Sequence, residues 1–260
     1  MSGYILCEVK KADKPYYIKN ICTNIYSIEE LCYYFYHNLY LIDRSIMNEE
    51  LCDWIEEELH CRELAEKLRH RVGKFAVVED VLYPVFKEIN YLTYDELKKL
   101  SSRVARYDAE SPLVREKKKA DALAANGMYV HAIKVYQELL KKPRLEEAKN
   151  GLTVQIWHNL GCVYSYLFQM EKTLDCFEQA IKAGGGEKEQ KAYLMAYKTI
   201  RTPIEYESKL TELGFVESIP KEIEEDLERF ARKPERKVYV QHVDELLTAF
   251  MKDYHRSTGS

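Results

Sequence analysis

The stretch from Trp157 to Tyr164 constrains the fold of this chain more than any other. It has the form W-x₂-L-G-x₂-Y, and Phe177 and Ala180 continue a series of apolar residues at spacings of three and four. Residues at these spacings lie on one face of a helix. Because Gly161 has no side chain, it allows a second helix to pack closely against the first. The stretch therefore predicts two tightly packed helices that are consecutive in the sequence.

An upstream segment, Lys118 to Lys142, has a similar pattern. Asn126-Gly127 is a turn signal between two apolar series. Ala132 in the second series corresponds to Thr173, which follows 41 residues later. We therefore expect a second pair of helices, with a longer connection at Pro143 to Leu152 between the two pairs.

The two segments together resemble the tetratricopeptide repeat, a helical pair with a usual period of about 34 residues. The resemblance covers residues 113–201, where Glu187 to Arg201 would be a third first helix or a cap. Two positions depart from the family pattern: Thr173 stands where alanine is usual, and Gly184 to Gly186 replace the usual closing proline. The resemblance implies an array of stacked helical hairpins whose concave face binds other polypeptides.

The whole chain is expected to be mostly α. Its 260 residues contain only 10 glycines and 7 prolines, which favours long helices over turn-rich β structure. We expect a mainly helical N-terminal domain with one short β-hairpin at residues 1–110. Tetratricopeptide-like repeats follow at residues 111–201. Residues 202–260 are expected to form C-terminal helices that pack on the repeats. The first boundary is placed at Asp108 to Pro112, where the apolar pattern breaks.

The N-terminal domain begins with the only plausible β-hairpin, over residues 4–25. Residues 4–9 are predicted as its first strand and Tyr16 to Ile25 as the returning strand. Ser27 and Glu30 form a predicted capping box, which starts a helix that runs to about Leu41. Internal packing is favoured for a tyrosine stripe on this helix, and an exposed contact surface is the alternative. The stripe consists of Tyr33, Tyr36 and Tyr40.

Charge and cysteine content bound the class of protein. The net charge is −4, yet residues 111–200 carry 14 basic against 10 acidic side chains, which favours an acidic partner for the repeats. No apolar run is long enough for a transmembrane helix, and the N-terminus lacks the pattern of a secretory signal. Seven cysteines without a C-x₂-C pair indicate reduced thiols in a cytoplasmic protein. No membrane or nucleic-acid partner is expected.

The sequence contains no motif that predicts catalysis. It has no phosphate-binding loop, no G-x-S-x-G and no H-E-x₂-H. Cys52, His60, Cys61 and His70 could in principle hold a metal, but their spacing fits no familiar zinc pattern. We therefore expect neither an enzyme nor a protein with a metal or cofactor. Catalysis by residues that meet only in the folded chain is the alternative.

The predicted binding surface is the inner face of the first helices of the repeats. This face is polar with one aromatic residue, which suits an extended peptide or a partner helix. Some arrays of the family hold terminal carboxylates with lysine and asparagine; Lys117 and Asn159 align with two such positions, whereas Asp121 stands where asparagine is needed. The predicted groove residues are Lys117, Asp121, Gln155, His158, Asn159, Cys162, Ser165 and Tyr166.

These features predict a non-enzymatic adaptor or scaffold that binds a protein or peptide, with an acidic partner favoured. The alternative is a peptide-sensing transcriptional regulator with an N-terminal DNA-binding domain. Residues 1–110 carry 15 basic against 20 acidic side chains, and DNA binding normally needs clustered lysine and arginine. The adaptor is therefore preferred. No feature of the sequence specifies an oligomeric state.

Overall fold

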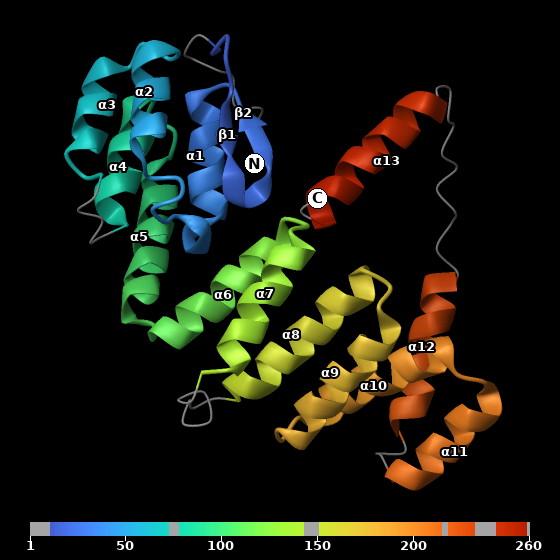
Figure 1. Ribbon diagram of the computed structural model, residues 1–260. Coiled ribbons are helices and arrows are strands. Elements are labelled where there is room, and N and C mark those ends of the chain that lie inside the picture. The colour runs from blue at the N-terminus through green and yellow to red at the C-terminus, as the bar shows by residue number, and fades with distance from the viewer. Residues whose placement is uncertain (1–10, 73–77, 143–150, 215–217, 232–242, 259–260) are drawn as a thin grey trace. The chain divides into compact units, whose positions relative to one another are not determined.

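The chain is mostly α-helical and divides into two compact units (Figure 1). The computed structural model describes residues 11–72, 78–142, 151–214, 218–231 and 243–258. Within these ranges it has thirteen α-helices and one two-stranded antiparallel sheet, which confirms the predicted mostly α class. The units are residues 1–126 and 127–260, so the predicted boundary at residue 110 lies inside the first unit.

The β-hairpin of the first unit lies later in the chain than the sequence predicts. Strand β1 (Tyr16–Ile18) pairs with β2 (Thr23–Ile25), and the register places Tyr16 opposite Ile25. The prediction of one returning strand over residues 16–25 is therefore wrong, and the predicted strand at 4–9 lies outside the described residues. A 3₁₀ turn, η1 (Lys19–Ile21), and Cys22 in a left-handed conformation (φ 49°) reverse the chain within that stretch.

The helices of the first unit begin at the residues that can cap them. Ser27 and Glu30 form the predicted capping box, with the Glu30 amide donating to Ser27 Oγ at 3.2 Å. The helix ends at His37 and not near Leu41, and the Asn38 side chain donates to the Tyr34 carbonyl at 3.1 Å. The helical elements of this unit are α1 (Ile28–His37), η2 (Leu39–Leu41), α2 (Glu49–Glu57), α3 (Arg62–Arg69), α4 (Glu79–Glu88), α5 (Tyr94–Ala109) and α6 (Pro112–Ala125).

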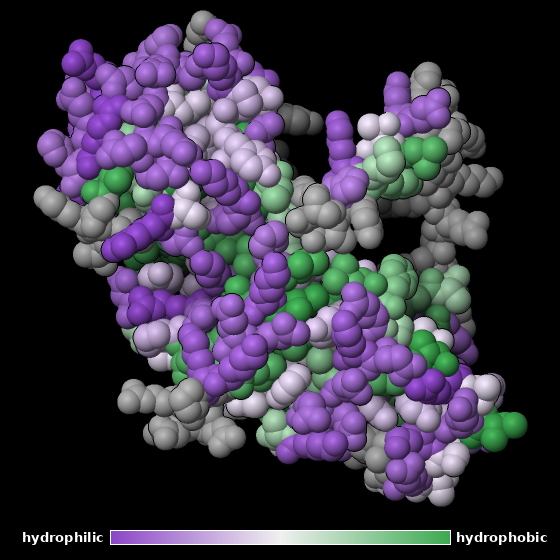
Figure 2. Space-filling view, viewed as in Figure 1, coloured by the Kyte–Doolittle hydropathy of each residue, from purple (hydrophilic) through white to green (hydrophobic). Residues whose placement is uncertain are grey.

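The tyrosine stripe of α1 and η2 is not an internal surface throughout. The side chain of Tyr33 is 58% exposed, so the favoured prediction of internal packing is wrong for it. The ring of Tyr36 lies under the guanidinium of Arg103 at 5.0 Å, and the Tyr40 hydroxyl donates to Glu110 at 3.0 Å. Polar neighbours therefore cover this stripe in part, while Phe35 on the same helix is fully buried. The surface over α2 and α3 is mostly hydrophilic in Figure 2.

The second unit is a succession of helices in which consecutive members from α7 to α11 pack against each other, while α13 contacts α7. Helix α7 contacts α8, α8 contacts α9, α9 contacts α10, and both α11 and α12 contact α10. The turn between α8 and α9 has three residues, so these two helices run antiparallel (Figure 1). Most of the predicted long connection at 143–152 lies outside the described residues. The helices are α7 (Tyr129–Leu140), α8 (Leu152–Tyr166), α9 (Met170–Lys182), α10 (Glu187–Ile200), α11 (Pro203–Leu213), α12 (Ser218–Ala231) and α13 (Val243–Thr258).

Gly161 brings α8 and α9 into close contact, as the sequence predicts. A Cβ atom at Gly161 would lie 2.7 Å from Cε1 of Phe177 and 3.2 Å from Cβ of Cys176. Real Cβ atoms do not approach other carbons to less than 3 Å. Thr173 is fully buried on α9, and its hydroxyl donates to the Gln169 carbonyl at 3.2 Å. The helices therefore meet at a distance that only glycine at position 161 permits.

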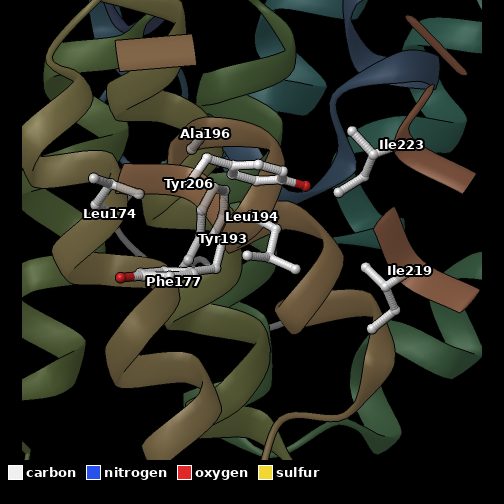
Figure 3. Packing of buried hydrophobic residues seen from close by; sticks show 8 residues of the cluster. All are labelled: Leu174, Phe177, Tyr193, Leu194, Ala196, Tyr206, Ile219 and Ile223. Carbon is white, nitrogen blue, oxygen red and sulfur yellow. The ribbon is translucent and has the colours of Figure 1, made fainter. Parts of the chain in front are cut away.

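A single apolar cluster joins the last helices that pack on α10. Figure 3 shows these side chains gathered between α9, α10, α11 and α12. Ion pairs surround the cluster: the Lys191 ammonium lies 2.9 Å from carboxylates of both Glu222 and Asp226 on α12. By contrast, the apolar residues Leu247, Phe250 and Met251 of α13 are more than half exposed. The cluster consists of Leu174, Phe177, Tyr193, Leu194, Ala196, Tyr206, Ile219 and Ile223.

The described cysteines are all free thiols, and burial distinguishes their reactivity. Burial raises the pKa of Cys176 to about 12 and the pKa of Cys52 to about 11, whereas Cys22 is only partly buried. Because the thiolate is the reactive form, we expect iodoacetamide at pH 8 to modify Cys22 in the native protein and to spare Cys176. Peptide mass spectrometry after timed quenching measures both rates, and equal rates would contradict the burial of Cys176.

None of the helices within the described ranges has the length and apolar character needed to cross a lipid bilayer.

Candidate peptide-binding surface

One face of α8 carries four of the eight predicted groove residues. Gln155, Asn159, Cys162 and Tyr166 follow each other at spacings of four, three and four, so they form one stripe along the helix. Gln155 and Tyr166 are exposed, while Asn159 and Cys162 are partly buried. Ile156, on an adjoining side of α8, is fully buried. Cys162 of the stripe packs against the apolar cluster that includes Leu174, Phe177 and Leu194. The exposed residues of the stripe are therefore Gln155 near its beginning and Tyr166 at its end.

Two other predicted groove residues on α8 lie differently. His158 is buried, its ring lies 5.4 Å from that of Phe177, and its Nδ1 atom lies 3.5 Å from Oε1 of Glu189. His158 therefore packs towards α9 and α10. It does not line the predicted groove. The reason is that position 158 lies beside the stripe, on the side that α9 covers. Ser165 is partly buried, and its hydroxyl donates to the Cys162 carbonyl at 2.7 Å.

The remaining two predicted residues lie on α6, in the first unit. The Lys117 ammonium is 2.7 Å from Oδ2 of Asp121, one helical turn away. The Lys117 side chain is only 13% exposed, and the adjacent Asp121 carboxylate balances its charge. Six of the eight predicted residues thus lie on α8, where four share one stripe and His158 is buried beside it, and Lys117 and Asp121 form an ion pair on α6.

The C-terminal end of α8 presents exposed aromatic rings. Tyr166 is 65% exposed, and its ring stacks on that of Tyr129 with centroids 5.1 Å apart and planes 5° apart. Phe168, in the turn after α8, is 88% exposed and has a left-handed backbone (φ 55°). For a residue other than glycine this conformation costs about 1–2 kcal/mol. A strained and fully exposed phenylalanine is therefore a candidate contact residue.

The sequence does contain a signal for Phe168, although the predicted groove leaves this residue out. Phe168 lies in the short turn between two predicted helices, where glycine or asparagine is the usual choice and a large aromatic residue is not. The pattern of apolar spacing ends before this residue, and so it identifies only Tyr166.

A groove of about 570 Å³ lies between α7, α8 and α9. Leu140, Trp157 and Leu160 supply apolar side chains, and the charged residues of the lining are Lys141, Lys172 and Asp175. The Tyr164 hydroxyl, which also lines the groove, accepts a hydrogen bond from Gln137 at 3.0 Å. Trp157 is only partly buried, and its exposed part contributes to the surface of this groove. In Figure 2, apolar side chains gather over α7 and α8.

No metal site is evident within the described ranges. They contain no group of three or more histidine, cysteine, aspartate or glutamate side chains that could hold a metal ion. His60, Cys61 and His70, considered from the sequence, do not form such a group with Cys52.

Comparison with known proteins provides no relative from which a role could be transferred. No family model matches the chain, and no curated protein or solved structure matches it significantly. The function is therefore argued from the surface of α8 and its neighbours.

Proposed function

We propose that this chain is a non-enzymatic adaptor that holds a peptide or helix of a partner protein against α8. The main support is the exposed pair Tyr166 and Phe168 at the end of a polar stripe. Exposed aromatic residues are enriched where proteins bind one another, because they bury a large area and lose little conformational freedom. Gln155 and Asn159, on the same stripe, make the surface beside this pair polar.

The packing of α7 to α10 supports the tetratricopeptide interpretation of this proposal. In such an array each helical pair contacts only its neighbours, and small residues let the pairs approach closely. Gly161 has this role between α8 and α9, since a Cβ atom there would overlap Phe177. Successive contacts from α7 to α10 fit the same arrangement. The partner in this proposal is an acidic polypeptide, and the site of action is the cytoplasm.

Substitution of the two exposed aromatic residues is expected to remove binding without unfolding the protein. A randomised peptide library displayed on phage is selected against the full chain, and an enriched peptide is then synthesised. We expect Tyr166→Ala together with Phe168→Asn to weaken its affinity by about tenfold or more, as measured by calorimetry. Because asparagine tolerates the left-handed conformation, the free energy of unfolding should change by less than about 1 kcal/mol.

A matched control uses two exposed residues of α9. Glu178→Ala together with Gln179→Ala removes a similar number of side-chain atoms from an exposed surface of the same unit. This control should leave the peptide affinity unchanged within about twofold. Equal affinity of the wild type and the Tyr166 and Phe168 variant would show that the end of α8 does not bind the peptide.

A further inference from the structure

The first unit contains a cationic pocket that shares only Asp121 with the predicted groove. It has a volume of about 470 Å³ and lies between η2, α5 and α6. Three cations line it, namely Arg103 and Arg106 of α5 and Lys118 of α6, together with the single carboxylate of Asp121. Leu39 and two alanines add apolar surface. A pocket of this composition attracts an anionic group that carries an aliphatic part.

One wall of the pocket is held rigid by hydrogen bonds. The Tyr40 hydroxyl donates to Glu110 at 3.0 Å and accepts a hydrogen bond from the Lys118 ammonium at 3.0 Å. Lys118 also forms an ion pair with Glu110. Desolvation lowers the pKa of Lys118, but its bonds to Glu110 and Tyr40 outweigh that effect and raise the pKa above its ordinary value. Lys118 is therefore charged and already paired with Glu110. Its main effect is on the shape of the pocket, because its charge is largely balanced by that carboxylate.

The two arginines supply the charge that remains available. Within the described part of the chain, neither Arg103 nor Arg106 forms an ion pair with a carboxylate. They lie three residues apart on α5 and so on the same face. The guanidinium of Arg103 lies over the ring of Tyr36 at 5.0 Å, which holds it in one orientation. Asp121, the one carboxylate that lines the pocket, pairs with Lys117 at 2.7 Å.

We propose that this pocket binds side-chain carboxylates of an acidic peptide through the forked guanidinium groups of Arg103 and Arg106. Planar guanidinium groups pair with carboxylates through two parallel hydrogen bonds. Leu39 and the two alanines beside the arginines suit a glutamate or aspartate side chain, whose carboxylate is carried on an aliphatic stem. The pocket belongs to the first unit and its lining includes no residue of α8, so this inference goes beyond the function proposed for α8.

Labelled hexaglutamate is the probe, and fluorescence anisotropy with the full chain at low salt is the measurement. We expect hexaglutamate to bind and uncharged hexaglutamine not to bind. Arg103→Gln together with Arg106→Gln should weaken hexaglutamate binding by about tenfold or more. The matched control, Lys98→Gln together with Lys99→Gln, removes the same charge from positions of α5 outside the pocket. It should cost less than about threefold, because exposed charges are screened.

Three results would overturn this proposal. The first is that hexaglutamate does not bind. The second is that the arginine variant and the lysine variant lose equal hexaglutamate affinity. The third is that labelled hexathymidylate binds more tightly than hexaglutamate and requires the arginines, which would indicate a nucleic-acid site. Substitution of Tyr166 and Phe168 distinguishes the pocket from the function proposed for α8. If that substitution leaves the affinity for the selected library peptide unchanged while hexaglutamate binding still requires Arg103 and Arg106, the proposal for α8 is wrong and the proposal for the pocket is supported.

Discussion

Replacement of Gly161 by valine should lower the free energy of unfolding of the second unit by about 3 kcal/mol. The first added carbon alone would lie 2.7 Å from a ring carbon of Phe177, and that ring is itself buried. A shift of the ring must displace its neighbours in the apolar cluster with α10. Gly161→Ala should cost less, because alanine regains about 1 kcal/mol of helix propensity.

Tryptophan fluorescence can assign this loss to one unit. The chain has two tryptophans, with Trp54 in the first unit and Trp157 in the second. In a Trp54→Phe background, urea unfolding followed by fluorescence therefore reports on the second unit alone. Gly186→Val is the control, since no atom lies within 4 Å of a Cβ at that position, and it should cost about 1 kcal/mol or less. An unchanged urea midpoint for Gly161→Val would contradict the close contact of α8 and α9.

Truncation of Phe35 should destabilise the first unit by about 3–5 kcal/mol. Its side chain is fully buried on α1, so alanine removes apolar contacts and leaves a cavity. Tyr33→Ala on the same helix is the matched control. Because Tyr33 is 58% exposed, its loss should cost about 1 kcal/mol or less.

The measurement is urea unfolding followed by Trp54 fluorescence in a Trp157→Phe background. We expect the Phe35 variant to unfold at a clearly lower urea concentration than the Tyr33 variant. If the two variants were equally destabilised, the tyrosine stripe would be part of the core and the orientation of α1 would be incorrect.

Local signals in the sequence predicted much of the helical framework. The capping box of Ser27 and Glu30 was predictable because both partners lie within one helical turn. The close contact at Gly161 was predictable because a glycine within an apolar helical series leaves room for a neighbouring helix. The hairpin was misplaced because Tyr16 to Ile25 has strand-forming residues throughout, and the reversal at Cys22 depends on a residue that rarely adopts a positive φ.

The candidate sites were less predictable, because they depend on contacts between distant residues. Spacing placed Gln155, Asn159 and Tyr166 on one stripe, but it could not show that His158 beside them would be covered by α9. The cationic pocket brings together Tyr40, Arg103 and Lys118, which are widely separated in the sequence. No periodic pattern relates such positions, and only the folded chain places the two arginines of α5 beside η2 and α6.

Photo-crosslinking from the end of α8 tests the adaptor account most directly. A benzophenone derivative of phenylalanine replaces Tyr166 in the full chain, and in a second variant it replaces Gln179 on the exposed side of α9. Both are irradiated with the selected library peptide, and the covalent products are sequenced by mass spectrometry. The account predicts a peptide adduct at position 166 and none at 179. Adducts at position 179 alone, or equal yields at both positions, would contradict it.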